Sequence, residues 1–109
     1  MSTPGYAEEQ PERTEVDTLP GATLLVFGTE WCGYCQRAER PLREALADHP
    51  ELRVLKVEDG PGRPLGRSFG IKLWPSLIFL RDGVEVDRLV RPTQTEQIAA
   101  GLTAIDPRG

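Results

Sequence analysis

The chain lacks several features that mark nucleic-acid-binding, membrane and disulfide-rich secreted proteins. Its 13 Lys and Arg residues are outnumbered by 17 Asp and Glu residues, so the formal net charge is −4 and no basic nucleic-acid surface is expected. No apolar run approaches the roughly 20 residues that a membrane-spanning helix needs. Two cysteines are too few for the multi-bridge framework of a small secreted domain. We therefore expect neither nucleic acid nor a membrane as a partner.

The length of 109 residues and the composition fit one globular domain. Hydrophobic residues make up 39% and charged residues 28% of the chain, which is typical of folded proteins. Residues 1–19 are polar, and we expect a flexible N-terminal tail with a short strand or turn near Thr14–Leu19. The domain is then expected over residues 20–109. An N-terminal Met without an export signal predicts a cytoplasmic protein, and nothing in the sequence demands more than a monomer.

Apolar patterns predict alternating strands and helices after this tail. Thr23–Phe27 is a continuous apolar run, typical of a strand buried on both faces. From Cys35 to Leu46 the apolar residues recur at helical spacing. The further expected elements are strands at Leu52–Val57, Leu77–Leu80 and Val84–Val90, the last two joined by an Asp82-Gly83 turn, a short helix at Leu65–Phe69, and a helix capped by Thr93 and Glu96 that buries Ile98, Leu102 and Ile105. This order predicts an α/β protein with a central mixed sheet of about four strands flanked by helices.

The stretch Trp31-Cys32-Gly33-Tyr34-Cys35 lies where the buried strand ends and the first long helix begins. Unpaired N–H groups at a helix N-terminus carry about half a positive charge, which stabilises a thiolate. We therefore expect the pKa of Cys32 to fall from about 8.5 into the range of roughly 3.5–7.5. The Cys32 thiolate would attack a substrate disulfide, and Cys35 would then displace the substrate and close the Cys32–Cys35 bridge.

Two other uses of this cysteine pair are disfavoured. Zinc normally takes four ligands, and the chain offers only His49 besides the cysteines and no second C-x-x-C motif, so no metal site is expected. A purely structural bridge would close so short a loop that it removes little entropy from the unfolded chain. The favoured interpretation is a redox pair, for which we expect no cofactor.

These features in this order resemble the thioredoxin superfamily. The resemblance depends on Trp-Cys-x-x-Cys after a buried strand, on Pro75 at the head of an apolar strand, and on the Asp-Gly hairpin, and it runs from about Thr23 to Ile105. It implies a thioredoxin-like fold and a protein disulfide oxidoreductase. The implied partners are disulfide-containing protein substrates and an electron-donor reductase.

The resemblance also implies a substrate groove beside the cysteines. The peptide bond before Pro75 would be cis, and Trp74, Pro75 and Ser76 would contact the substrate. The remaining active-site neighbours by this resemblance are Trp31, Gly33, Tyr34 and Lys56.

Several positions depart from the pattern of ordinary thioredoxins. Val26 stands where those proteins carry a buried Asp that assists the second cysteine, Tyr34 replaces the proline between the cysteines, and Arg91 replaces a glycine at the groove. By the resemblance, the lysine partner of that Asp is kept as Lys56, and a strand-end lysine that reaches solvent is the alternative. The N-terminal strand and helix are expected to be shortened or missing. We predict slower attack by Cys35 and a reduction potential above about −270 mV, nearer −200 to −230 mV.

Two alternative functions stay open at this point. A glutaredoxin-like enzyme would carry Thr-Val before its proline and a Gly-Gly-x-Asp segment after it, whereas this chain has Leu73-Trp74-Pro75 and no Gly-Gly pair. A non-catalytic binding module would use exposed Trp31, Tyr34 and Trp74 as an aromatic docking patch. An ordinary thiol pKa without turnover would favour the binding module.

Overall fold

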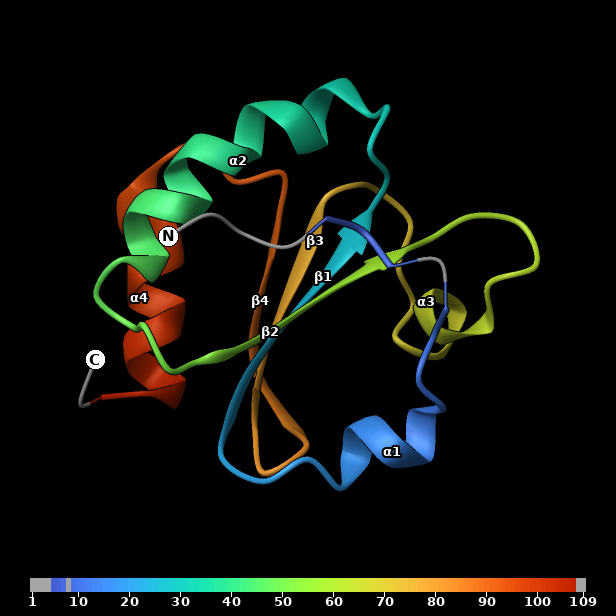
Figure 1. Ribbon diagram of the computed structural model, residues 1–109, viewed down its shortest axis with the longest axis horizontal. Helices are drawn as coiled ribbons and strands as arrows, with labels where there is room; N and C mark the ends of the chain where they lie inside the picture. The colour runs from blue at the N-terminus through green and yellow to red at the C-terminus, as the bar shows by residue number, and fades with distance from the viewer. Residues whose placement is uncertain (1–4, 8, 108–109) are drawn as a thin grey trace.

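Four strands form one mixed sheet in the order β2-β1-β3-β4 (Figure 1). The computed structural model describes residues 5–7 and 9–107. Its elements are α1 (Arg13–Asp17), β1 (Ala22–Gly28), α2 (Gly33–Leu46), β2 (Arg53–Glu58), α3 (Pro64–Ser68), β3 (Ser76–Arg81), β4 (Val84–Val90) and α4 (Thr95–Ile105). Strand β1 runs parallel to β2 and antiparallel to β3, which is antiparallel to β4. The predicted α/β class with a four-stranded mixed sheet is confirmed.

Helices cover both faces of this sheet, with α2 and α4 on one side and α1 and α3 on the other (Figure 1). Side chains alternate along a strand, so β1 supplies both layers. Leu24 and Val26 face α2 and α4, whereas Leu25 and Phe27 face the layer with α1 and α3. In the described part of the chain, no helix has the length and apolar character needed to cross a membrane.

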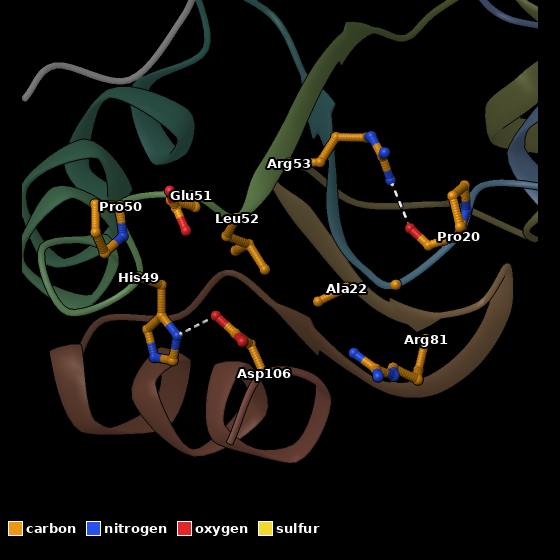
Figure 2. Close-up of a pocket in the computed structure, with 10 residues that line it drawn as sticks. Pro20, Ala22, His49, Pro50, Glu51, Leu52, Arg53, Arg81 and Asp106 are labelled. Atoms are coloured by element: carbon orange, nitrogen blue, oxygen red, sulfur yellow. Dashed lines mark hydrogen bonds and ion pairs between the residues drawn. The ribbon is translucent and has the colours of Figure 1, made fainter. Parts of the chain in front are cut away.

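The C-terminal ends of α2 and α4 contact each other at the end of the sheet where β1 begins. The Nδ1 atom of His49, just after α2, lies 2.9 Å from Oδ2 of Asp106, just after α4 (Figure 2). These two residues line a hollow of about 560 Å³ together with Ala22 and Arg53, the first residues of β1 and β2. The cysteines follow the opposite end of β1, so His49 is placed away from them.

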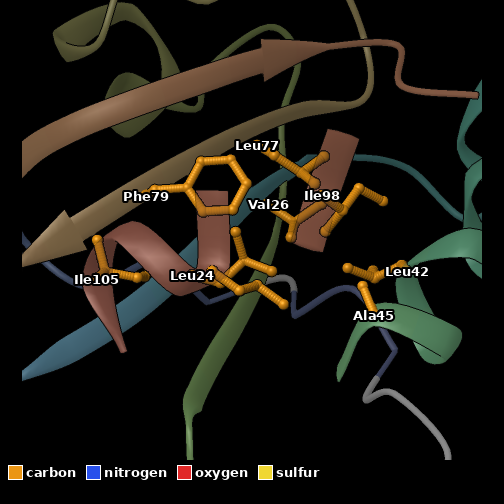
Figure 3. Close-up of a cluster of buried hydrophobic side chains, with 9 residues drawn as sticks. Leu24, Val26, Leu42, Ala45, Leu77, Phe79, Ile98 and Ile105 are labelled. Atoms are coloured by element: carbon orange, nitrogen blue, oxygen red, sulfur yellow. The ribbon is translucent and has the colours of Figure 1, made fainter. Parts of the chain in front are cut away.

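The layer between the sheet and α2 and α4 holds a close-packed apolar core (Figure 3). Phe79 of β3 is fully buried, as are Ile98 and Ile105 of α4. Leu42 and Ala45 belong to the same core and fix the buried face of α2. Because this face also carries Cys35, the core determines where the second cysteine lies relative to β1.

The N-terminal segment contains more structure than was expected from its composition. The prediction of a short strand or turn near Thr14–Leu19 is wrong, because α1 forms there and buries Val16 completely. Ala7 forms a single parallel bridge with Val57 of β2. Part of the expected tail of residues 1–19, namely residues 1–4 and 8, lies outside the described residues, and its flexibility stays a prediction.

The hairpin between β3 and β4 turns at the predicted residues. Asp82 and Gly83 adopt φ angles of 52° and 79°, the left-handed conformation that two-residue hairpin turns require. Gly83 is also needed for space, because a Cβ there would collide with the backbone carbonyl of Asp17. The turn therefore packs against the end of α1.

Helix α4 begins later than predicted. Its N-cap is Gln94, and the Gln97 side chain accepts hydrogen bonds at 3.2 Å from the backbone N–H groups of Thr93 and Gln94. The prediction that Thr93 and Glu96 form the capping box is therefore wrong by one residue. The predicted buried stripe of the helix is confirmed at Ile98, Leu102 and Ile105.

Candidate active site

Cys32 is the N-cap residue of α2, directly after the loop that leaves β1. Its Sγ atom accepts a hydrogen bond from the backbone N–H of Cys35 at 3.4 Å, so the sulfur occupies the position of a capping side chain. Cys32 is 7% exposed and Cys35 is 1% exposed. Gly33, the first residue of the helix, is exposed. The structure thus brings the two predicted cysteines together in the first turn of α2.

The two thiols differ in how tightly they hold a proton. Burial acts to raise the pKa of Cys32, but hydrogen bonds from the Cys35 thiol and from the backbone N–H groups of Cys35 and Tyr34 lower it below its ordinary value. The positive charge of Arg91 acts in the same direction. Burial, and the hydrogen bond between the two thiols, raise the pKa of Cys35 to about 11. Of the two, Cys32 is therefore the thiol that ionises first.

A tyrosine from the N-terminal segment lies against the buried thiol. The Tyr6 hydroxyl hydrogen-bonds the Cys35 sulfur and opposes the rise in its pKa. Burial raises the pKa of Tyr6 itself, so its hydroxyl keeps its proton and can act as a donor. Gly28 leaves the room for this contact, since a Cβ there would lie 2.6 Å from the Cys35 sulfur and 2.7 Å from the Tyr6 hydroxyl oxygen.

The backbone on both sides of Tyr6 holds it in this place. The N–H of Ala7 donates to the carbonyl of Lys56 at 2.8 Å, and the N–H of Glu58 donates to the carbonyl of Ala7 at 2.9 Å. The N–H of Tyr6 donates to the Glu30 carboxylate at 3.0 Å. Sequence reasoning missed this residue, because a single aromatic in a polar segment gives no pattern.

Lys56 is buried behind Cys35 and is paired with a carboxylate. Its Nζ donates to the Glu39 carboxylate at 2.7 Å and lies 4.5 Å from the centre of the Tyr6 ring. The alternative in which Lys56 reaches solvent is wrong, since its side chain is only 2% exposed. Glu39 follows Cys35 by four residues and so lies on the same face of α2. That spacing was the signal that could have identified Glu39.

Because position 26 is a valine, Lys56 pairs with a carboxylate of α2 and not with a residue of β1. Val26 is the register partner of Lys56 in the parallel pair of β1 and β2, and its side chain belongs to the apolar core. It offers no charge to the neighbouring ammonium group. A buried ammonium group needs a charged partner, and Glu39 supplies it from α2.

A cavity of about 280 Å³ opens on this side of Cys35. Tyr6, Thr29, Glu39 and Lys56 line it together with the thiol. The Thr29 hydroxyl is buried and has no hydrogen-bond partner among the residues that the structure describes. A polar cavity of this size can hold water, which would satisfy such a group.

The loop before β3 lies beside the cysteine segment. The Trp74–Pro75 peptide bond is cis, as the family resemblance implies. The Trp74 ring meets that of Trp31 edge to face, with centroids 5.7 Å apart. Its indole N–H donates to the Asp59 carboxylate at 2.9 Å, a partner that the sequence did not reveal.

Ser76 lies in this region but not at its surface. It is 2% exposed, and its hydroxyl donates to the carbonyl of Leu73 at 2.6 Å. A direct contact between the Ser76 side chain and a substrate is therefore not supported. The hydrogen bond instead stabilises the loop that carries Trp74 and Pro75.

Arg91 connects the cysteine segment with this loop. Its φ angle is 52°, its N–H donates to the carbonyl of Pro75 at 2.9 Å, and its Nε donates to the carbonyl of Trp74 at 2.8 Å. The guanidinium lies 3.7 Å from the centre of the Tyr34 ring. Trp31 and Tyr34 remain 73% and 48% exposed, so an aromatic and cationic surface surrounds Cys32.

Metal binding gains no support from this arrangement. His49, the further ligand that a zinc site would need, contacts Asp106 at the other end of the sheet. Over residues 5–7 and 9–107, no group of three or more His, Cys, Asp or Glu side chains is placed to hold a metal ion.

A dithiol at the start of a helix, with one thiol acidic and the other buried, defines a thiol–disulfide oxidoreductase. The thioredoxin family profile matches residues 8–104, and the chain belongs to the thioredoxin family. The chain is therefore an enzyme of thiol–disulfide exchange with a C-x-x-C pair, and neither a glutaredoxin-like enzyme nor a non-catalytic binding module is favoured.

Individual relatives support the same assignment. The chain is 38% identical over 71 residues to a thioredoxin of Chlamydia muridarum (strain MoPn / Nigg), covering 64% of this chain and 69% of that protein. It is 32% identical over 87 residues to a Thioredoxin H-type of Populus jackii, covering 77% of this chain but only 63% of that relative. The structure of reduced thioredoxin 2 from Pseudomonas aeruginosa PAO1 is similar with a TM-score of 0.86 and 51% identity, covering 97% and 98% of the two chains.

Proposed function

We propose that the reduced protein transfers two electrons to disulfides of protein substrates, with Cys32 as the attacking thiol and Cys35 as the resolving thiol. The observation that carries the assignment is the N-cap position of the Cys32 sulfur, which lowers its pKa while Cys35 stays buried and protonated. The thiolate is the nucleophile of disulfide exchange, so the more acidic thiol reacts first.

The reaction balances over two steps. In the first, the Cys32 thiolate forms a bond with one substrate sulfur, the substrate disulfide breaks, and the departing sulfur takes a proton. In the second, Cys35 loses its proton and attacks the Cys32 sulfur, so that the Cys32–Cys35 bond forms and the second substrate thiol leaves. The substrate gains two electrons and two protons, and the protein becomes a disulfide.

The second step depends on removing a proton from a buried thiol. We infer that Tyr6 stabilises the developing Cys35 thiolate by hydrogen bonding, because its hydroxyl already contacts that sulfur. Glu39 lines the same cavity and belongs to the same helix as Cys35, so the proton would leave by way of this residue and water. Glu39 and Tyr6 would thus do the work of the acid that Val26 replaces.

The substrate would approach on the opposite side of Cys35 from this cavity. Trp74 contacts Trp31, the residue before the attacking cysteine, and Arg91 donates to the carbonyl of Trp74, which supports Trp74 and Pro75 as the border of the substrate site. Gly33 and Tyr34, at the exposed start of α2, would face the same substrate.

Membership of the thioredoxin family indicates the general classes of partner. Thioredoxins act on disulfide-containing substrates and are reduced by a reductase. For this chain, an electron-donor reductase, a monomeric state and a cytoplasmic location stay predictions from the sequence.

Trapping of mixed disulfides tests the two roles. A Cys35→Ser variant, incubated with a disulfide-containing protein such as insulin, should accumulate a Cys32-linked adduct that mass spectrometry detects. A Cys32→Ser variant should accumulate none, because Cys35 is buried and holds its proton. Stable adducts through Cys35 alone would contradict the assignment, and an unreactive wild-type protein would remove the proposed function.

A further inference from the structure

A hollow of about 290 Å³ lies beside Tyr34, next to the attacking cysteine. It is lined by Tyr34, Arg37, Arg91, Pro92 and Thr93. Two of these five residues carry a positive charge and none carries a negative one. The hollow is therefore locally positive, although the net charge of the chain is −4.

The two arginines are held on one tyrosine ring. The guanidinium carbon of Arg91 lies 3.7 Å from the centre of the Tyr34 ring, and that of Arg37 lies 4.6 Å from it. Stacking on an aromatic ring orients a guanidinium and leaves its edge N–H groups available. The Nε of Arg91 is used by the Trp74 carbonyl, which fixes the side chain further.

Neither arginine has a carboxylate partner within the described part of the chain. Other arginines are paired there, such as Arg88 with Glu85 at 2.6 Å and Arg13 with Asp17 at 2.9 Å. Both guanidinium groups line the hollow without a carboxylate partner among the described residues, and guanidinium N–H groups of this kind bind planar carboxylates. The charge of Arg91 also reaches the Cys32 sulfur, which places the hollow within electrostatic range of the reacting atom.

We propose that Tyr34, Arg37 and Arg91 form a subsite for a carboxylate side chain that flanks the disulfide of the substrate. The inference rests on the proposed function, because it names the substrate class for the same site. One residue spans about 3.3–3.6 Å of extended chain. Tyr34, which lines the hollow, follows Cys32 by two residues, so an acidic residue next to the substrate cysteine would enter the hollow while that cysteine contacts Cys32.

Three synthetic peptide disulfides test the proposal directly. They are identical except that Glu, Gln or Lys precedes the cysteine, and each is mixed with the pre-reduced protein in single turnover. The second-order rate constant should fall in the order Glu, Gln, Lys, with the Glu and Lys peptides about three- to tenfold apart. At about 1 M salt the Debye length is about 3 Å, so the ratio of the Glu rate constant to the Lys rate constant should fall toward one.

Matched variants locate the effect. Arg37→Gln and Arg91→Gln should each reduce the ratio of the Glu rate to the Lys rate. Arg91→Gln also removes the hydrogen bond to the Trp74 carbonyl. Arg37 makes no such hydrogen bond among the described residues, so Arg37→Gln tests the effect of the positive charge without loss of a loop contact. Arg43→Gln is the control, because it removes the same charge from an exposed position of α2 that does not line the hollow.

The outcomes separate the subsite from the proposed function. Equal rates for all three wild-type peptides would overturn the subsite and leave the disulfide reductase intact. An acidic preference that Arg43→Gln reduces as much as Arg37→Gln does would also overturn it, since net charge alone would then explain the preference. Failure to reduce any of the peptides would remove both proposals together.

Discussion

Replacing Tyr6 by Phe removes one hydroxyl from the environment of Cys35 and leaves the ring against Lys56. A hydrogen bond to a charged group contributes about 1.5–3 kcal/mol. When the Cys35 sulfur attacks, it carries only part of a full charge, so we take about half of this value for the transition state. The second step should therefore slow about three- to tenfold, at about 1.4 kcal/mol for each factor of ten.

Reaction with an aromatic disulfide that releases a coloured thiol separates the two steps. Attack by Cys32 releases the first coloured thiol and resolution by Cys35 releases the second, so stopped-flow absorbance should show two phases. In Tyr6→Phe only the second phase should slow. Loss of the donor raises the pKa of Cys35 further. The second phase of Tyr6→Phe should therefore be slower than that of the wild type by the full factor well below pH 11, and the two rates should converge as the pH approaches that value. Tyr34→Phe, an exposed tyrosine near the other thiol, is the control, and an unchanged second phase in Tyr6→Phe would refute the reasoning.

Three further predictions concern the redox couple and the core. Equilibration with glutathione buffers should give a reduction potential above about −270 mV, because the thiolate stabilised at Cys32 favours the dithiol; a potential at or below that value would contradict this. Val26→Asp should speed the second stopped-flow phase by placing a carboxylate beside Lys56. No acceleration would argue against the idea that the missing acid slows the attack by Cys35. Gly101→Ala should be destabilising by up to about 2 kcal/mol in urea titrations, because overpacking costs about 1–3 kcal/mol. The helix propensity gain of about 1 kcal/mol is outweighed by overpacking, since the new methyl would lie 2.5 Å from the Phe79 ring, and a more stable variant would show that the ring moves away.

The sequence was informative wherever one local pattern determines one element. The apolar run Thr23–Phe27 predicts β1, and Asp82-Gly83 predicts the hairpin, because strand burial and turn geometry act within a few residues. Helix α1 could not be found in this way. It has five residues and buries only Val16, so it shows no periodicity and depends on its contact with the sheet.

The same distinction holds within the active site. Cys32 and Cys35 were predicted because their spacing and their position after a strand both appear in the sequence. The contact of Tyr6 with Cys35 depends on the bridge between Ala7 and β2, which joins segments that are distant in the chain. Pairing of Lys56 with Glu39 likewise depends on how α2 lies over the sheet. Such long-range contacts leave no periodic signal.

Rapid alkylation with quantitative mass spectrometry tests the assignment of the two thiols most directly. The reduced protein is mixed with a limiting amount of iodoacetamide across a pH series, and the label on each cysteine is counted. We expect Cys32 to be labelled first at neutral pH, and the midpoint of its labelling against pH should lie below the ordinary thiol pKa of about 8.5. The reason is that hydrogen bonds at the start of α2 stabilise its thiolate and outweigh the opposing effect of burial. Cys35 should stay unlabelled until the pH approaches its pKa of about 11. Labelling of Cys35 before Cys32 would contradict the account.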